Sequence, residues 1–181
     1  MTINVLFILM SFHIILSKNY SSNEIMEYIE DIRAKDSLEH YFMVVDPEEY
    51  LEKAKRSLLF NFFKSLHKKN KLNLIAIILD EIQDEKSLSS FNKELIEILN
   101  SKGNKDDKYI LITITVKNHF LLLTNSQNLK KDYSEEILNS FLLRSKDLLN
   151  NDKYFEAIFE LAKSINFAEI KNKRNSETTD L

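Results

Sequence analysis

The sequence predicts an α/β fold, a three-layer α/β/α-like sandwich around a central mixed sheet of about four strands. Apolar runs rich in strand formers at 41–45, 72–79, 109–116 and 119–124 alternate with segments whose apolar residues recur at helical spacing. The run at 72–79 is almost continuously apolar, as in a central strand covered on both faces. The expected order is strand, helix, strand, helix, hairpin, helix, helix, with right-handed crossovers that place the long helices on the sheet.

Composition limits the possible classes of protein. The chain has 181 residues, 44% of them hydrophobic, which suits one compact domain. A formal net charge of −3 excludes a strong general field for nucleic acid, and no nucleic-acid partner is expected. The absence of cysteine excludes disulfides, cysteine-based zinc sites and thiol nucleophiles.

The first seventeen residues predict a signal peptide. Val5 to Leu16 form an apolar run, too short for the ~20 residues that span a bilayer but typical of a leader. The alternative is a buried first strand or helix. Asn19 begins an N-glycosylation sequon. We therefore expect a secreted or lumenal glycoprotein without a transmembrane anchor, because no later apolar run approaches ~20 residues.

The strand-forming run at 41–45 ends at Asp46 and Pro47, which suit the cap and first turn of a helix. That helix is expected to run to about Lys69. A preceding segment at 18–40 is expected to be a lead-in, with one amphipathic helix at 22–38.

The middle and end of the chain follow the same reading. After the central strand we expect a helix at 87–99, a loop at 102–108 and a hairpin that turns at Lys117-Asn118. Two helices follow, at 133–150 and 153–167. The predicted organisation is a signal peptide at 1–17, a lead-in at 18–40, an α/β domain at 41–168 and a disordered polar tail at 169–181.

Several of these segments together resemble the TPM domain family. They are the opening strand with its aspartate (Val44-Val45-Asp46-Pro47), the apolar strand LIAIILD (74–80), the loop GNKDDK (103–108), the hairpin (110–115 and 120–124) and the closing helix (152–165). The loop is similar to the family's Gly-x-Lys-x-x-Asp-x-Gly pattern. The resemblance covers about 43–165, and it is carried by order and spacing.

The sequence also departs from the family pattern at three places. Tyr109 stands where the family has Gly after the loop, and Asn125-Ser126 stands where a Thr-Gly pair opens a turn. Lys117-Asn118 replaces an acidic pair in the hairpin turn. These departures put an inherited active site in doubt.

The resemblance implies several functions, because the family includes thylakoid-lumen acid phosphatases, bacterial secreted or membrane-tethered proteins and nematode modulators of levamisole-sensitive acetylcholine receptors. We expect a non-enzymatic interaction domain, an accessory of a membrane protein such as a receptor or channel. The alternative is a metal-dependent acid phosphatase that acts on phosphomonoesters. A third possibility is a degenerate domain with a purely structural role.

Acidic residues supply the candidate site. If the hairpin strands pair, Asp106, Asp107, Thr124 and Asn125 meet at one end of the sheet, and their oxygens suit Ca²⁺ or Mg²⁺. A metal there could orient a phosphate. Two weaker catalytic candidates are Asp46 and Asp80, the latter because it ends a central strand, where open α/β sheets bind ligands. The alternative for Asp46 is a helix cap, and for the other acids solvated loops.

Overall fold

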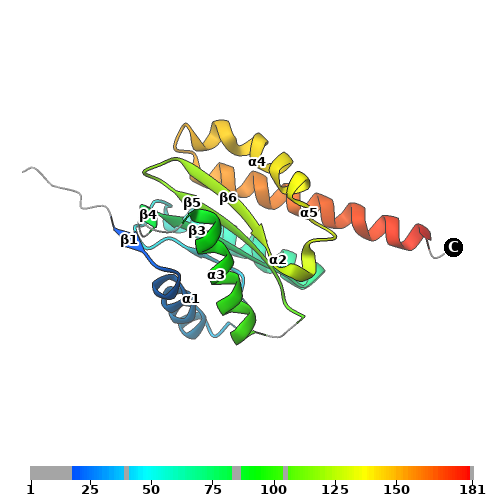
Figure 1. The fold of residues 1–181 in the computed structure, drawn as a ribbon, viewed down its shortest axis with the longest axis horizontal. Coiled ribbons are helices and arrows are strands. Elements are labelled where there is room, and N and C mark those ends of the chain that lie inside the picture. Colours follow the sequence, from blue (N-terminus) through cyan, green and yellow to red (C-terminus); the bar gives the residue numbers. More distant parts are fainter. Residues whose placement is uncertain (1–17, 39–40, 83–86, 104–105, 180–181) are drawn as a thin grey trace, which may run out of the picture.

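The computed structural model describes residues 18–38, 41–82, 87–103 and 106–179. A four-stranded sheet lies between two layers of helices, which confirms the predicted fold class (Figure 1). The strand order is β2-β3-β5-β6, with the first three strands parallel and the last antiparallel to its neighbour. The bounds are β2 (Met43–Val45), β3 (Leu72–Leu79), β5 (Lys108–Thr115) and β6 (Phe120–Asn125).

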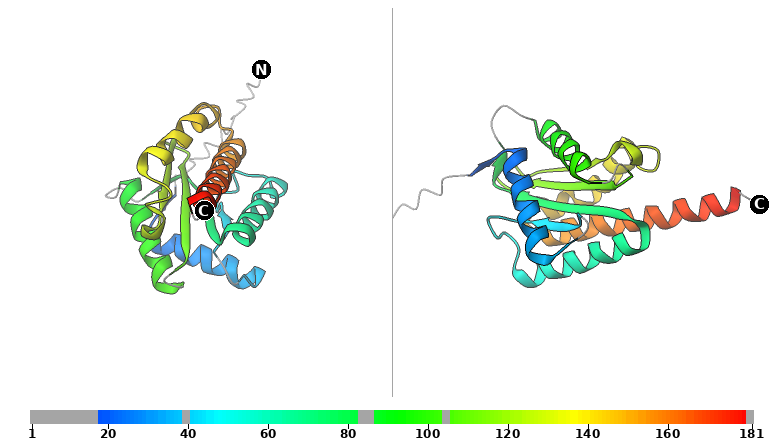
Figure 2. Two further views of the ribbon diagram at one scale, coloured as in Figure 1. Left: turned by 90° about the vertical axis from the view of Figure 1, so that its right-hand side faces the viewer. Right: turned by 90° about the horizontal axis from the view of Figure 1, so that it is seen from below.

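Each face of the sheet has its own core. Helices α2 (Lys53–Asn70), α4 (Glu135–Leu149) and α5 (Tyr154–Thr179) cover one face, and α1 (Ser22–Asp36) and α3 (Leu88–Lys102) cover the other (Figure 2). Every side chain of β3 is buried, as expected for a central strand. Successive residues of β3, such as Ala76 and Ile77, belong to opposite cores.

The two crossover helices lie on opposite faces, which the sequence did not predict. The connections β2-α2-β3 and β3-α3-β5 both step in the same direction across the sheet, so helices on opposite faces give them opposite hands. Only one can follow the usual right-handed rule. A two-stranded parallel pair supplies the reason. Directly after β3, β4 (Glu81–Ile82) pairs with β1 (Asn19–Tyr20), which leads the chain to the α1 side before α3 begins.

The predicted lead-in is an integral layer of the sandwich. Helix α1 starts with a reciprocal capping box between Ser21 and Glu24, which satisfies two otherwise free backbone donors. Its residues Ile25 and Ile29 are fully buried and pack with α3 against the sheet. The packed domain therefore begins before residue 41.

The segment after β2 is a loop and not the first turn of a helix. Helix α2 begins at Lys53, so the expected start at Pro47 is wrong, and Asp46 is not its cap. Glu49 has a φ of 58°, in the left-handed region that a helix cannot contain. The loop instead buries Leu51 in the core.

The hairpin connection is also longer than expected. The last cross-strand pair is Thr115 with Phe120, so four residues connect the strands and not Lys117-Asn118 alone. The backbone N–H groups of Val116 and Lys117 donate to the carbonyls of Leu79 and Asp80 at 2.8 and 3.2 Å. These bonds hold the chain against the end of β3 before it turns.

The last helix continues past its expected end at residue 167. The backbone of α5 stays helical to Thr179, in place of the disordered tail expected from composition, and its end projects beyond the sheet (Figures 1 and 2). No Gly or Pro interrupts this stretch. Glu169, which is 8% exposed, accepts a 2.8 Å hydrogen bond from the Tyr133 hydroxyl and fixes the helix beyond Phe167. None of the helices within the described ranges is sufficiently long and apolar to cross a membrane.

Candidate functional site

The carboxyl ends of the parallel strands carry the two weaker catalytic candidates, Asp46 after β2 and Asp80 after β3. The Asp46 side chain is buried, and its Oδ1 and Oδ2 accept the backbone N–H groups of Tyr50 and Leu51 at 2.9 and 2.8 Å. Burial raises the pKa of Asp46, and the Leu51 N–H opposes that shift. Both carboxylate oxygens therefore hold the loop between β2 and α2.

Glu48 joins Asp80 at this end, although no sequence pattern predicts it. The Tyr20 hydroxyl donates to the Glu48 carboxylate, while the backbone N–H of Lys18 donates to Asp80 Oδ2 at 3.2 Å. Burial raises the pKa of Glu48, and the charge of Asp80 raises it further. Glu48 therefore takes up a proton more readily than an exposed glutamate does. The contact between Glu48 and Tyr20 cannot be predicted from a local sequence pattern, because Tyr20 belongs to β1, far from Glu48 in the chain.

The predicted metal residues lie at the opposite end of the sheet, at the start of β5. Ile110 pairs with Asn125, so the hairpin brings Asp106, Asp107 and residues 124–125 to the same edge, as the sequence predicted. Asp106 is exposed, and Asp107 is partly buried. This end of the sheet and the end that carries Asp46 and Asp80 are separated by the full length of β3, so the acidic candidates form two groups.

At the end of the sheet where β5 begins, the side chains of Thr124 and Asn125 point in different directions. Thr124 Oγ1 accepts a 3.0 Å hydrogen bond from Asn92 of α3, on one face of the sheet. Asn125 Nδ2 donates to the Tyr133 carbonyl at 2.8 Å, on the other face. Successive strand residues point to opposite faces, so these two side chains do not turn toward one ion. Nowhere in the described ranges do three acidic or histidine side chains converge as a metal site.

Tyr109 fills the space at this edge. It is fully buried, and its hydroxyl donates to Asp107 Oδ2 at 3.0 Å. Burial raises the pKa of Tyr109, so its hydroxyl stays protonated as a donor. Gly103 makes room for this pair, because a Cβ there would lie 2.3 Å from the Tyr109 hydroxyl and 2.8 Å from Asp107 Oδ2. The lone glycine is therefore required by close packing.

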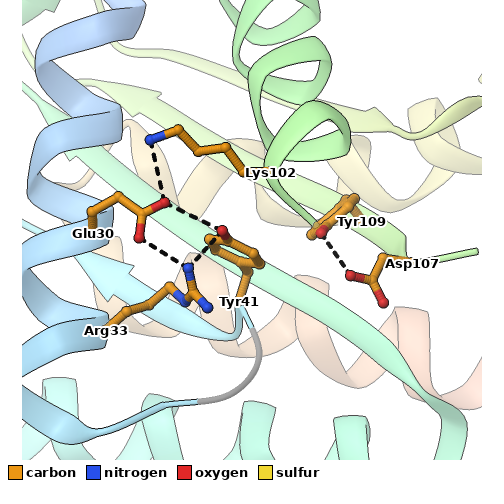
Figure 3. A network of polar contacts seen from close by, with 6 residues as sticks. All are labelled: Glu30, Arg33, Tyr41, Lys102, Asp107 and Tyr109. Carbon is orange, nitrogen blue, oxygen red and sulfur yellow. Dashed lines mark hydrogen bonds and ion pairs between the residues drawn. The ribbon is translucent and has the colours of Figure 1, made fainter. Parts of the chain in front are cut away.

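A polar network extends from Tyr109 to α1 (Figure 3). The Tyr41 and Tyr109 rings meet edge to face with centroids 6.0 Å apart, and the Arg33 guanidinium lies 3.9 Å from the centre of the Tyr41 ring. Glu30 accepts a 2.9 Å bond from Arg33 and forms a 3.4 Å ion pair with Lys102 of α3. These contacts hold α1 and α3 against the sheet. The polar side chains at this end of the sheet therefore stabilise the fold.

Two hollows lie beside the outer edge of β6. One hollow of about 380 Å³ is apolar, lies between the start of β6 and α4, and is lined mainly by Phe120, Leu121, Leu142, Leu143, Lys146 and Leu149. A second, more polar hollow of about 570 Å³ lies between α3, α4 and the end of β6. The two share Asn139, so they form one surface, here called the β6 groove. Neither hollow contains any of the predicted catalytic aspartates.

Comparisons with solved structures agree with this fold. The N-terminal domain of a protein from P. gingivalis has a TM-score of 0.67 at 14% identity, covering 83% of this chain and 92% of its own. The BA42 protein of Bizionia argentinensis has a TM-score of 0.60 at 11% identity, covering 70% and 86%. The N-terminal domain of the cg2496 protein of Corynebacterium glutamicum has a TM-score of 0.58 at 11% identity, covering 74% and 84%. At these identities the likeness concerns the fold alone.

Sequence comparison gives the family. No curated protein matches the chain significantly. The family model of the TPM domain matches residues 44–167, from β2 into α5, and so includes both acidic edges and the β6 groove. Over this range the order of strands and helices is the one expected from the resemblance. The chain belongs to the TPM domain family.

Proposed function

We propose that this TPM domain is a protein-binding domain, an accessory of a membrane protein such as a receptor or channel, and not a hydrolase. One observation carries the proposal, the apolar hollow of the β6 groove. Phe120 and Leu143 on its rim are 60% and 74% exposed, beside a strand with an open edge. Apolar side chains gathered on a surface are typical of binding sites for other proteins.

The state of the acidic residues also supports a binding role. Asp46 holds the loop after β2 with both oxygens, and Asp107 accepts from the buried Tyr109 hydroxyl. Thr124 and Asn125 are engaged on opposite faces. Binding a phosphate at either set would require these bonds to be replaced.

The binding role is tested with the natural chain, purified from the culture medium of cells that express it. It is used to capture partners from native membranes or extracellular fluid, and each candidate is remade and tested as a purified pair. We expect saturable binding to a purified membrane protein in the presence of EDTA. Absence of any reproducible purified partner, together with phosphomonoester turnover, would overturn the proposal.

The place of action is part of the proposal. The apolar run before Lys18 and the sequon at Asn19, whose side chain is exposed in β1, support the secretory pathway. Mass spectrometry of the secreted chain is expected to show a new N-terminus near Lys18 and a glycan on Asn19. An intact Met1 on the exported chain would count against the leader.

The second candidate is a metal-dependent acid phosphatase, favoured by one observation, the raised pKa of Glu48 beside Asp80 at the carboxyl edge of the sheet. A carboxyl with a raised pKa is suited to general acid catalysis. Hydrolysis of p-nitrophenyl phosphate with Ca²⁺ or Mg²⁺ should then be lost in Glu48→Gln. The pair Asp106→Asn and Asp107→Asn tests the other edge in the same assay.

A further inference from the structure

We propose that the β6 groove binds an extended segment of the partner protein, which adds to the sheet as a fifth strand. A bulky apolar side chain of that segment enters the apolar hollow, and a carboxylate two residues away, on the same face of the added strand, meets Lys146 and His119. This inference rests on the proposed function and names the surface and the chemistry of the partner.

The open edge of β6 is the first support. Strand β6 is last in the sheet order, so within the described residues its outer edge has no strand partner. It is six residues long, whereas the opposite edge strand, β2, has three. A long apolar edge without a proline or an inward charge is unprotected against strand addition. Peptides commonly bind by completing such an edge with main-chain hydrogen bonds.

The apolar hollow supplies a place for a side chain beside that edge. Its floor consists of Leu121, Leu142 and Leu149, and Phe120 and Leu143 stand at its rim. The volume of about 380 Å³ accommodates one aromatic or branched side chain. In an added strand, alternate side chains would point to this side of the sheet. One bulky anchor residue on that face of the added strand therefore fits.

The charges of the groove define the residue two positions from the anchor, on the same face of the added strand. In the apolar half the charged or titratable side chains are Lys146 and His119, both cationic when protonated. His119 Nδ1 already lies 3.8 Å from an Asp152 oxygen. The polar half is balanced, with Lys93 and Lys130 against two glutamates. A carboxylate at that position is therefore complementary, and a lysine there is not.

The open backbone also decides between a peptide and a lipid surface. A bilayer could cover Phe120 and Leu143, but it offers no donors or acceptors for the outer N–H and C=O groups of β6. Unsatisfied backbone groups in hydrocarbon cost several kcal/mol each. An extended peptide satisfies them with its own backbone. The occupant is thus a peptide strand.

The test starts from a display library of random ten-residue peptides selected on the natural chain. Selected peptides are synthesised with a fluorescent label, and affinity is measured by anisotropy. We expect an acidic residue two positions from a bulky apolar one, and amide shifts in NMR spectra confined to residues 119–125, α3 and α4. N-methylation of alternate peptide nitrogens should abolish binding. Shifts elsewhere, or indifference to N-methylation, would overturn the inference.

Two variants separate the groove from the rest of the surface. Leu143→Glu, at a side chain 74% exposed, should weaken binding on the order of tenfold or more. Leu58→Glu, at a side chain 58% exposed on α2, is the matched control and should change nothing. Lys146→Glu should weaken acidic peptides and favour their lysine-substituted forms.

The remaining outcomes are also decisive. Leu143-dependent cosedimentation with phosphatidylcholine–phosphatidylserine vesicles, or Leu143-dependent dimerisation in ultracentrifugation, would replace the peptide by another occupant and overturn the inference. If the purified protein partner binds Leu143→Glu as tightly as the natural chain, the binding function stands and the β6 groove is not its site. If no protein partner exists, the function itself fails.

Discussion

The space left by the only glycine of the chain yields a quantitative prediction. In Gly103→Ala the new Cβ would lie 2.3 Å from the Tyr109 hydroxyl, closer than packed atoms allow. Tyr109 cannot move away freely, because its ring is buried against Tyr41. Overpacking of this kind costs about 1–3 kcal/mol. Displacing the hydroxyl from Asp107 adds about 1 kcal/mol or more, so we expect a total near 2–4 kcal/mol.

The Tyr109→Phe background isolates the cause. Without the hydroxyl the closest contact disappears, and Asp107 can turn away because it is only partly buried. The alanine should then cost about 1 kcal/mol or less, which gives a coupling energy of about 1–3 kcal/mol between the two positions. Urea unfolding followed by circular dichroism measures all four chains of the cycle. The melting temperature should fall by roughly 2–4 °C per kcal/mol.

Tyr154→Phe provides the matched control. Tyr154 also donates to an aspartate two residues earlier, Asp152 at 2.7 Å, but it lies at the start of α5, in the other helical layer. Its loss should add to that of Gly103→Ala without coupling. If Gly103→Ala costs the same in the natural, Tyr109→Phe and Tyr154→Phe backgrounds, the packing argument is refuted.

Three other substitutions test buried polar groups. Asn73→Leu should stabilise the fold by about 1–3 kcal/mol, because the fully buried amide has no hydrogen-bond partner among the described residues; a lower urea midpoint would contradict this. Asn92→Ala should destabilise by about 2–4 kcal/mol, because it removes bonds of 2.9 and 3.0 Å to Thr113 and Thr124; a loss below about 1 kcal/mol would show that the network is dispensable. Burial raises the pKa of Glu48, so its contribution to stability is full below the unfolded-state pKa and is lost as pH rises through the raised value. Relative to Glu48→Gln, the natural chain should therefore lose urea resistance as the pH rises above about 4.3, the usual pKa of a glutamate in an unfolded chain, and parallel pH curves would contradict that.

Local patterns predicted the sheet well, because its strands differ strongly from their surroundings. The run at 72–79 matches β3, and pairing of the hairpin follows from two apolar runs close together. Loop details depended on contacts from elsewhere. Asp46 and Pro47 have the composition of a helix start, yet the buried Leu51 and the N–H groups bound by Asp46 favour a loop.

The candidate site was only partly accessible to sequence reasoning. The position of Asp80 at the end of a central strand can be predicted from the sequence, but the surroundings of Glu48 depend on Tyr20, which β1 brings from the start of the chain. Likewise, hairpin pairing correctly placed Asn125 near the acidic loop. It could not reveal which face each side chain would choose, because that depends on α3 and on Tyr133.

The position of α1 has a practical consequence for anyone who expresses this domain. The family match starts at residue 44, whereas Ile25, Met26 and Ile29 of α1 cover Met43, Val45 and neighbouring β3 residues. Burial of each such side chain is worth about 1.5–3 kcal/mol. A recombinant fragment that starts at the family boundary would expose this apolar surface to solvent and aggregate. A fragment that starts at Lys18 retains α1, which shields that face of the sheet from solvent.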